Sequence, residues 1–302
     1  MVSDMHGAYT QRKSTVGPDV TIATKNNART IEKCINSIRI NIPSRRLVVI
    51  DNSTDNTPAI ARRCGAIVLR ETGMLGKVRY AQARACKTKW IAYVDSDVYV
   101  YASWWPEVSK FANSPDVGMV LGFADAHLTK LPIYDAYLKY LAERQGAVAF
   151  SNTLIRRQLV LDCFKELSRI HVGEDDVVAA HVRRKGFKII TVPKPLCFHD
   201  KDPFTTHPRD YFRAGQSLWI KWGLWGLVVC GFSLRTTLLN WSRFSVGSRR
   251  LSLKLLGFLL VLWLWMVAGF MKMHSPLDGA GNIVCSHLGQ SDRRQQKLVG
   301  VD

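Results

Sequence analysis

The feature that most constrains the fold is a regular alternation of two kinds of segment that begins at Asp19. The first kind is short and continuously apolar, and it predicts a buried strand over 20–23 and further strands over 47–50, 66–69 and 90–94. The second kind has apolar side chains at helical spacing, and it predicts helices over 28–40, 57–64 and 77–87. Apolar strands separated by helices are typical of a mainly parallel sheet with helices on both faces. The sequence therefore predicts an α/β fold.

The alternation is less regular after the fourth strand. It predicts strands over 117–123, 147–155 and 187–192, and helices over 133–144 and 174–185. The pattern ends between 199 and 208, so we expect one α/β domain over 19–210. A flexible polar segment over 1–18 precedes it and shows no secretory signal, which indicates a domain on the cytoplasmic side of a membrane.

The composition changes sharply after residue 210. Residues 211–277 contain no Asp or Glu, whereas they contain eight Lys and Arg. The uncharged run 255–271 predicts a transmembrane helix over 251–272, with a buried core helix as the alternative. Residues 211–250 are expected to form basic interfacial or membrane-associated helices, with a second span over 222–234 as the alternative. Residues 273–302 are expected to form a polar tail.

The distribution of charge favours a membrane surface as the partner of the basic segment. The formal net charge of +18 calls for a polyanionic neighbour: nucleic acid, an anionic membrane surface or phosphorylated substrates. The acid-free stretch is also the hydrophobic one, so we expect an anionic membrane surface and no nucleic acid. Five basic residues lie between 235 and 254, and two spans would place them outside, against the positive-inside tendency. We therefore expect a single-pass or monotopic protein of the cell membrane.

Seven scattered cysteines without CxxC spacing indicate neither a disulfide framework nor a zinc site, and they suit a reducing compartment.

Acidic residues follow two of the predicted strands. Asp51 ends the second strand, and Asp95-Ser96-Asp97 comes directly after the fourth. Ligands of parallel α/β sheets bind at the carboxyl ends of the strands. Two carboxylates at such an end can share a divalent cation, and that cation can neutralise a departing diphosphate.

Four motifs occur in order along the predicted α/β domain. They are the strand and loop 20–27, the strand and acidic loop 47–57, the Gly-Lys loop, helix and DxD strand 76–98, and the Glu-Asp pair with its helix 173–187. With these motifs the sequence resembles the inverting glycosyltransferases of family 2, which have the GT-A nucleotide-diphospho-sugar transferase fold. The resemblance covers about 19–200. It implies a GT-A catalytic domain over 19–210 that transfers a sugar from a nucleotide-diphospho-sugar with inversion.

The resemblance implies roles for the residues at the strand ends. Thr24 and Asp51 would bind the base or ribose of the nucleotide-sugar donor, and Asp95 would lie close to the ribose and the metal. Asp97 would be the main protein ligand of the metal, with His199 approaching it from a later part of the chain. Carboxylate oxygens suit both Mg²⁺ and Mn²⁺, so the resemblance implies one of these two cations as cofactor.

The same resemblance implies roles for two helices. Lys77 and Arg79, at the start of one helix, would face the base or the diphosphate. Asp175, at the start of the other, is the candidate general base. Inverting transfer is a single displacement in which the acceptor hydroxyl must lose its proton as the new bond forms. Glu174 or Asp176 would replace Asp175 if the register differs by one residue.

The sequence also departs from the family pattern. Asn27 and Asn52 stand where many relatives carry an acidic residue, so uridine and guanosine donors both stay open. The Gln-rich signature with Arg-Trp of processive synthases is absent near Gln216, which favours transfer of a single sugar. A catalytic domain held at the membrane implies a membrane-associated acceptor, and a polyprenyl-phosphate or lipid-linked glycan is the expected one.

Two other classes of function stay open from the sequence. The first is a nucleotidyltransferase on a related fold, although such an enzyme is expected to carry a glycine-rich phosphate loop after its first strand, and 23–26 is not one. The second is a non-catalytic membrane or nucleic-acid-binding protein, which the charge alone suggests. The intact acidic motifs favour the enzyme over the non-catalytic protein.

Overall fold

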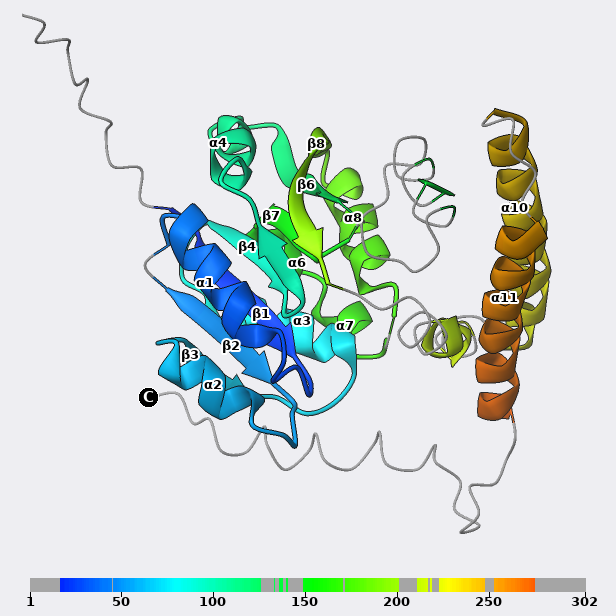
Figure 1. The fold of residues 1–302 in the computed structure, drawn as a ribbon, viewed down its shortest axis with the longest axis horizontal. Helices are drawn as coiled ribbons and strands as arrows, with labels where there is room; N and C mark the ends of the chain where they lie inside the picture. Colours follow the sequence, from blue (N-terminus) through cyan, green and yellow to red (C-terminus); the bar gives the residue numbers. More distant parts are fainter. Residues whose placement is uncertain are drawn as a thin grey trace, which may run out of the picture.

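The structure is a computed structural model, and it describes residues 17–44, 46–125, 133, 136–137, 140, 149–170, 172–200, 211–216, 218, 223–247 and 253–274. These residues form an eight-stranded sheet with the order β3-β2-β1-β4-β7-β6-β8-β5 (Figure 1). The strands are β1 (Asp19–Thr24), β2 (Leu47–Asp51), β3 (Ile67–Arg70), β4 (Trp90–Asp95), β5 (Val98–Val100), β6 (Val117–Asp125), β7 (Asn152–Arg156) and β8 (Lys188–His199).

The sheet is mixed, and its parallel part comes first in the chain. β3, β2, β1 and β4 are all parallel, whereas β7 pairs antiparallel with both β4 and β6. β8 runs parallel to β6 and antiparallel to β5. The predicted α/β fold with a mainly parallel sheet is thus confirmed, and the antiparallel strands lie in the part of the chain where the sequence pattern was less regular.

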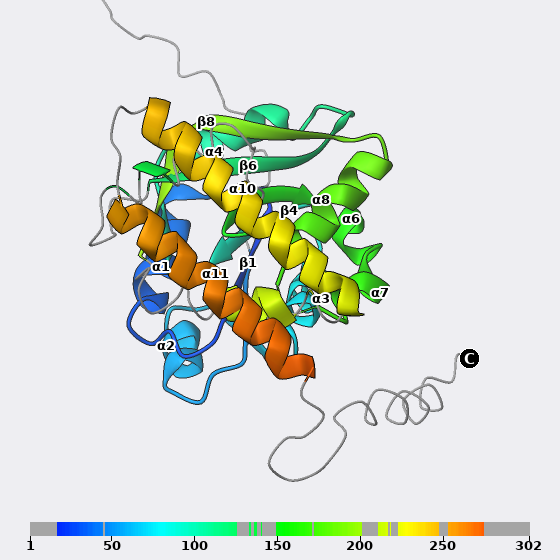
Figure 2. The same cartoon turned by 90° about the vertical axis from the view of Figure 1, so that its right-hand side faces the viewer.

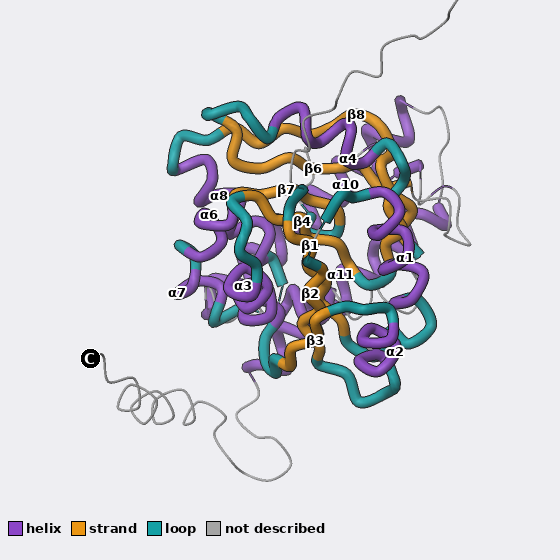
Figure 3. The backbone as a smooth tube through the Cα atoms, turned by 90° about the vertical axis from the view of Figure 1, so that its left-hand side faces the viewer, coloured by secondary structure: helices purple, strands orange, loops and turns teal. Residues whose placement is uncertain are grey.

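Helices cover both faces of the sheet, as the apolar strands predicted. They are α1 (Ile31–Asn41), α2 (Thr57–Arg63), α3 (Leu75–Ala85), α4 (Trp104–Val108), α6 (Arg157–Leu161), α7 (Phe164–Leu167) and α8 (Glu174–Arg184). One core cluster joins the sheet to α1, α2 and α4, and the other joins it to α3, α6, α7 and α8 (Figure 3). Val49 of β2 belongs to the first cluster and its neighbours Val48 and Ile50 to the second. Since successive side chains point to opposite faces, a strand covered on both sides is apolar throughout.

The main differences from the predicted elements lie after β4. β8 extends to His199, well beyond the strand predicted over 187–192, and β7 begins at Asn152 instead of 147. The short elements β5, α4, α6 and α7 were not predicted, because three to five residues are too few to show a periodicity. The helix predicted over 133–144 falls mostly outside the residues that the structure describes.

Two long helices follow the α/β domain. They are α10 (Gly226–Gly247), which extends beyond the apolar run 222–234, and α11 (Leu253–His274), which overlaps the membrane helix predicted over 251–272 from residue 253 on. The two helices lie side by side along one side of the molecule (Figure 2). Leu253–Met271 is long and apolar enough to cross a membrane by length and composition.

Candidate active site

The register of the parallel strands brings three predicted donor-binding residues to one edge of the sheet. Thr24 is paired with Asp51 between β1 and β2, and Ala23 is paired with Asp95 between β1 and β4. Thr24 and Asp51 are buried, whereas Asp95 is partly exposed. Thr24, Asp51 and Asp95 therefore end their strands at the same level, at the carboxyl edge where α/β sheets bind ligands.

Hydrogen bonds join the loops that follow β1 and β2 into one unit. The backbone N–H of Asn26 donates to Ser53 Oγ at 2.8 Å, and the N–H of Thr54 donates back to Asn26 Oδ1 at 2.8 Å. Asn26 has a φ of 59°, a left-handed conformation that Asn tolerates better than most residues. Beneath them, the N–H of Ser53 donates to Asp51 Oδ1 at 3.2 Å. Asp51 is thus oriented by the loop that would enclose the donor base.

Asn27, one of the departures from the family pattern, belongs to the same unit. Its N–H donates to Thr57 Oγ1 at 2.9 Å, and its side-chain amide donates to Thr24 Oγ1 at 3.3 Å and to the carbonyl of Lys25 at 3.2 Å. A carboxylate at this position could not donate these side-chain hydrogen bonds. The amide therefore ties the loop to its own strand end.

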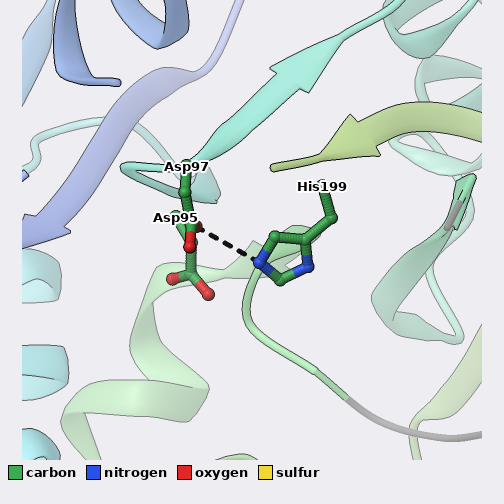
Figure 4. Close-up of side chains that lie close together, drawn as sticks. All are labelled: Asp95, Asp97 and His199. Atoms are coloured by element: carbon green, nitrogen blue, oxygen red, sulfur yellow. Dashed lines mark ion pairs between the residues drawn. The ribbon is translucent and has the colours of Figure 1, made fainter. Parts of the chain in front are cut away.

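A second cluster lies next to this edge. Asp95, Asp97 and His199 each place one ligand atom within 4.8 Å of the others, and all three are partly exposed. His199 Nε2 lies 3.2 Å from Asp97 Oδ1 (Figure 4). The pairing of β5 with β8 sets His199 directly opposite Val98, the residue after Asp97. Two carboxylates and an imidazole, open to solvent on one side, are a donor set that fits Mn²⁺ or Mg²⁺.

Asp200 contacts this cluster, and nothing in the sequence singles it out beyond its place next to His199. Its N–H donates to the carbonyl of Asp97 at 2.7 Å, and its carboxylate accepts from the Tyr99 hydroxyl at 2.8 Å. The Arg29 guanidinium lies 3.2 Å from Asp200 Oδ1. These contacts join the α1 side of the sheet to the end of β8, and they position Asp97 and His199 relative to each other.

Arg79 occupies the centre of the site, although its side chain is 6% exposed. Its Nη2 lies 3.0 Å from Asp95 Oδ1, and its Nε lies 3.3 Å from Glu174 Oε1. Burial opposes the charge of the guanidinium, but Asp95 and Glu174 favour it and keep the pKa of Arg79 above its ordinary value. Arg79 therefore bridges the DxD strand and the first turn of α8. A direct role in donor binding stays a prediction.

Lys77 lies at the start of a helix, as predicted, and that helix begins two residues earlier than expected, so that it includes Gly76. Both belong to the first turn of α3, which begins at Leu75. Gly76 is buried, its N–H donates to the carbonyl of Ile170 at 3.1 Å, and a Cβ there would collide with the carbonyl oxygen of Leu167. Close packing therefore requires the glycine at this position. Lys77 is exposed, and its contact with the donor stays a prediction.

The acidic first turn of α8 holds the candidate bases. Gly173 precedes it with a φ of 83°, a conformation that glycine adopts without strain. Glu174 is buried against Arg79, whereas Asp175 is partly exposed and Asp176 is exposed. Burial, followed by the charges of Glu174 and Asp176, raises the pKa of Asp175 to about 7. A carboxyl group with this pKa can accept a proton near neutral pH, which makes Asp175 a better candidate base than Glu174.

Comparison with known proteins agrees with this geometry. Residues 19–164 match the family model of Glycosyl transferase family 2. This segment is therefore similar to glycosyl transferase family 2. Two curated relatives are described as uncharacterized glycosyltransferases: one from Rickettsia bellii is 41% identical and one from Rickettsia felis 40% identical, each over 78 residues. The matched residues are 25% of this chain and 26% and 27% of those proteins, so the chain spans about a quarter of their length.

The likeness to family 2 is accompanied by a likeness in fold to a solved structure. A mannosyltransferase from Pyrobaculum calidifontis, solved in complex with GDP-Man and Mn²⁺, superposes with a TM-score of 0.56. The match covers 87% of this chain and 90% of that one at 18% identity. The fold of this chain is therefore the GT-A fold, as the resemblance in sequence predicted.

Proposed function

We propose that this family 2 protein transfers a single sugar from a nucleotide-diphospho-sugar to an acceptor hydroxyl with inversion at C1. The observation that carries the proposal is the juxtaposition of two acidic groups through Arg79. On one side is the Asp95-Asp97-His199 cluster, and on the other is the turn that holds Asp175. Catalysis of this reaction needs a site for the diphosphate and a base for the acceptor, and the two groups correspond to these needs.

The donor side of the site would bind the nucleotide. Thr24 and Asp51 stand at the strand ends where a base or ribose would lie, and the joined loops after β1 and β2 would exclude water from it. Asp95, Asp97 and His199 would hold the Mn²⁺ or Mg²⁺. When bound, that cation neutralises charge on the departing nucleoside diphosphate.

On the acceptor side, Asp175 would take the proton of the acceptor hydroxyl. As the acceptor oxygen forms its bond to C1 and the bond from C1 to the diphosphate breaks, the acceptor hydroxyl gives its proton to the Asp175 carboxylate. Attack from the face opposite the leaving group inverts the configuration at C1. Glu174 would act indirectly, because its carboxylate is buried against Arg79 and holds the turn in place.

The composition of the helices after the catalytic domain supports the proposal that the acceptor is membrane-associated. A chain whose acid-free segment is both basic and apolar is suited to an anionic membrane surface. We propose a polyprenyl-phosphate or a lipid-linked glycan as the acceptor, at the cytoplasmic face of the cell membrane. The pyrobaculum enzyme supports a GDP-sugar as one donor to test.

A binding experiment on the detergent-solubilised full chain tests the donor side. Nucleotide-sugars should raise the Tm in the presence of Mn²⁺ or Mg²⁺ and have a much smaller effect with a chelator. A ligand at 100 times its Kd stabilises by about 2.7 kcal/mol. Asp97→Ala should abolish the cation-dependent part, whereas Asp116→Ala, on an exposed loop, should retain it. Equal stabilisation of both variants would contradict the assignment of Asp97.

A further inference from the structure

The two C-terminal helices form a hairpin, hereafter the α10–α11 hairpin. The start of α10 packs against the end of α11: the Trp263 indole N–H donates to the carbonyl of Cys230 at 3.0 Å, and Gly226 lies against the ring of Phe270. The end of α10 packs against the start of α11, where Phe244 and Leu255 share one buried cluster. The hairpin is therefore an antiparallel pair in contact along its length.

Segments joined to the catalytic domain cover α11 at both of its ends. Near its start, Leu255 and Leu259 are buried in the cluster that contains Tyr137, from the connection between β6 and β7. Near its end, Met266 and Phe270 are buried in the cluster that contains Tyr211, from the connection after β8. The stretch from Leu255 to Phe270 contains 16 residues and is about 22 Å long at 1.5 Å per residue. The axis of α11 thus runs along the domain and does not project away from it.

Two glycines bring α11 and the helical segment 211–216 into backbone contact. A Cβ at Gly215 would collide with the carbonyl oxygen of Met266, and one at Gly269 would collide with the carbonyl oxygen of Phe212. Small residues at a crossing let helix backbones approach this closely. The contact leaves no room for lipid between α11 and the segment that follows β8.

The rest of the hairpin surface is apolar and carries positive charge. Large apolar side chains are exposed on both helices: Val228, Phe232, Leu239, Val261, Leu264 and Trp265. The charged side chains exposed among them, Arg235, Arg243 and Lys254, are all basic, because residues 211–277 contain no Asp or Glu. Monomeric soluble proteins seldom expose apolar side chains in this number on two adjacent helices.

We propose that the α10–α11 hairpin lies in the plane of an anionic membrane and inserts its exposed apolar side chains into one leaflet without crossing the bilayer. A crossing α11 would bring the connections that hold Tyr137 and Tyr211 into a hydrocarbon layer about 30 Å thick. Anionic lipid complements the basic side chains, whereas a second copy of the hairpin would bring like charges together. The proposal rests on the membrane attachment that the proposed function includes. Of the two topologies expected from the sequence, single-pass and monotopic, it selects the monotopic one.

The first test is topological and uses the natural Cys285, which lies beyond α11 in the sequence. In cells that express the full chain with Cys64→Ser, a membrane-impermeant maleimide should label residue 285 only after permeabilisation. The control is the double variant Cys64→Ser/Cys285→Ser, which should show only nonspecific labelling. The other cysteines of the described chain are buried. Labelling of residue 285 in intact cells would place it across the membrane from the catalytic domain and overturn the proposal.

The second test measures binding of the full chain to vesicles by flotation. Vesicles that contain phosphatidylglycerol should bind the chain more strongly than pure phosphatidylcholine. Val261→Glu combined with Leu264→Glu should weaken that binding about a hundredfold, since two apolar contacts are lost. The matched control Ile40→Glu changes an apolar residue that is 81% exposed on the catalytic domain and should bind as the parent does.

Two results would overturn the assignment of this surface to lipid: unchanged flotation of the double variant, or a change in its oligomeric state in solution without a change in flotation. Nucleotide-sugar stabilisation is measured separately on the same variant. Its retention would show that lost flotation is not a folding defect. If no nucleotide-sugar stabilises even the parent chain, the proposed function fails while the flotation result stands on its own.

Discussion

The two sides of the candidate site are assembled in different ways. Thr24, Asp51 and Asp95 end neighbouring parallel strands, and the register of β1 with β2 and β4 aligns them. Asp97 and His199 meet through the pairing of β5 with β8, which joins residues about a hundred positions apart. Glu174 is linked to Asp95 through Arg79. In the proposed function, the nucleotide would therefore be bound by neighbouring strands of one regular sheet, whereas the metal cluster and the acceptor side depend on single long-range contacts.

This difference implies that the two sides can be impaired separately. A change in the first turn of α8 should affect proton transfer and leave the donor bound, whereas a change at Arg79 should affect both sides. The predictions below follow from this difference, and the largest expected effect comes first.

Asp175→Asn should lower kcat about a thousandfold, because a positioned general base contributes about 10²–10⁴-fold to such a reaction. The stabilisation of this variant by nucleotide-sugar and cation should match that of the parent chain. Asp176→Asn, which changes the next and more exposed acid, is the matched control and should lower kcat little. If Asp176→Asn lowers kcat more than Asp175→Asn does, Asp176 is the general base instead of Asp175.

Arg79→Met should destabilise the folded protein by about 3 kcal/mol, because it leaves two carboxylates without their cation in a largely buried position. Urea unfolding measured by circular dichroism gives this value. Lys77→Met, on the same helix but exposed, should change stability by less than about 0.5 kcal/mol. Adding Glu174→Gln to Arg79→Met should restore part of the loss. Equal stability of Arg79→Met and Lys77→Met would show that Arg79 does not stabilise the protein by linking Asp95 to Glu174.

The smallest expected effect concerns pH. Asp175 must be deprotonated to act as a base, and its pKa is about 7, so kcat at saturating cation should rise with pH through about 7 and then level off. Glu174→Gln removes a charge that raises the pKa of Asp175, so the rise should move to lower pH. An unmoved profile would show that Glu174 does not act on the base.

The raised pKa of Asp175 affects activity and stability in opposite directions. As the pH rises, kcat should increase, whereas the contribution of Asp175 to the free energy of unfolding should decrease. The pKa of Asp175 is above its unfolded value of 3.8, so the folded state holds the proton more tightly. The contribution of this group to stability is therefore present at low pH and is lost as the pH rises through about 7.

The sequence predicted the parallel part of the sheet closely, because its strands are long enough to show an apolar pattern and its helices are regular. It also indicated which carboxylates end those strands. It did not predict β5 or α4, which are too short to show a period, nor the extension of β8 that carries His199 to Asp97. In the sequence, Arg79 looks like an ordinary exposed helix charge, and nothing local distinguishes it from Lys77.

By itself, then, the sequence determined the class of fold, the edge of the sheet that carries the site and the acidic residues on it. These follow from local periodicity and from the rule that ligands bind at strand ends. Only the tertiary structure decided that Arg79 joins Asp95 to Glu174, that Asp175 lies in a setting that raises its pKa, and that α11 runs along the domain. Each of these depends on burial and on contacts between residues distant in the chain, which a single sequence does not display.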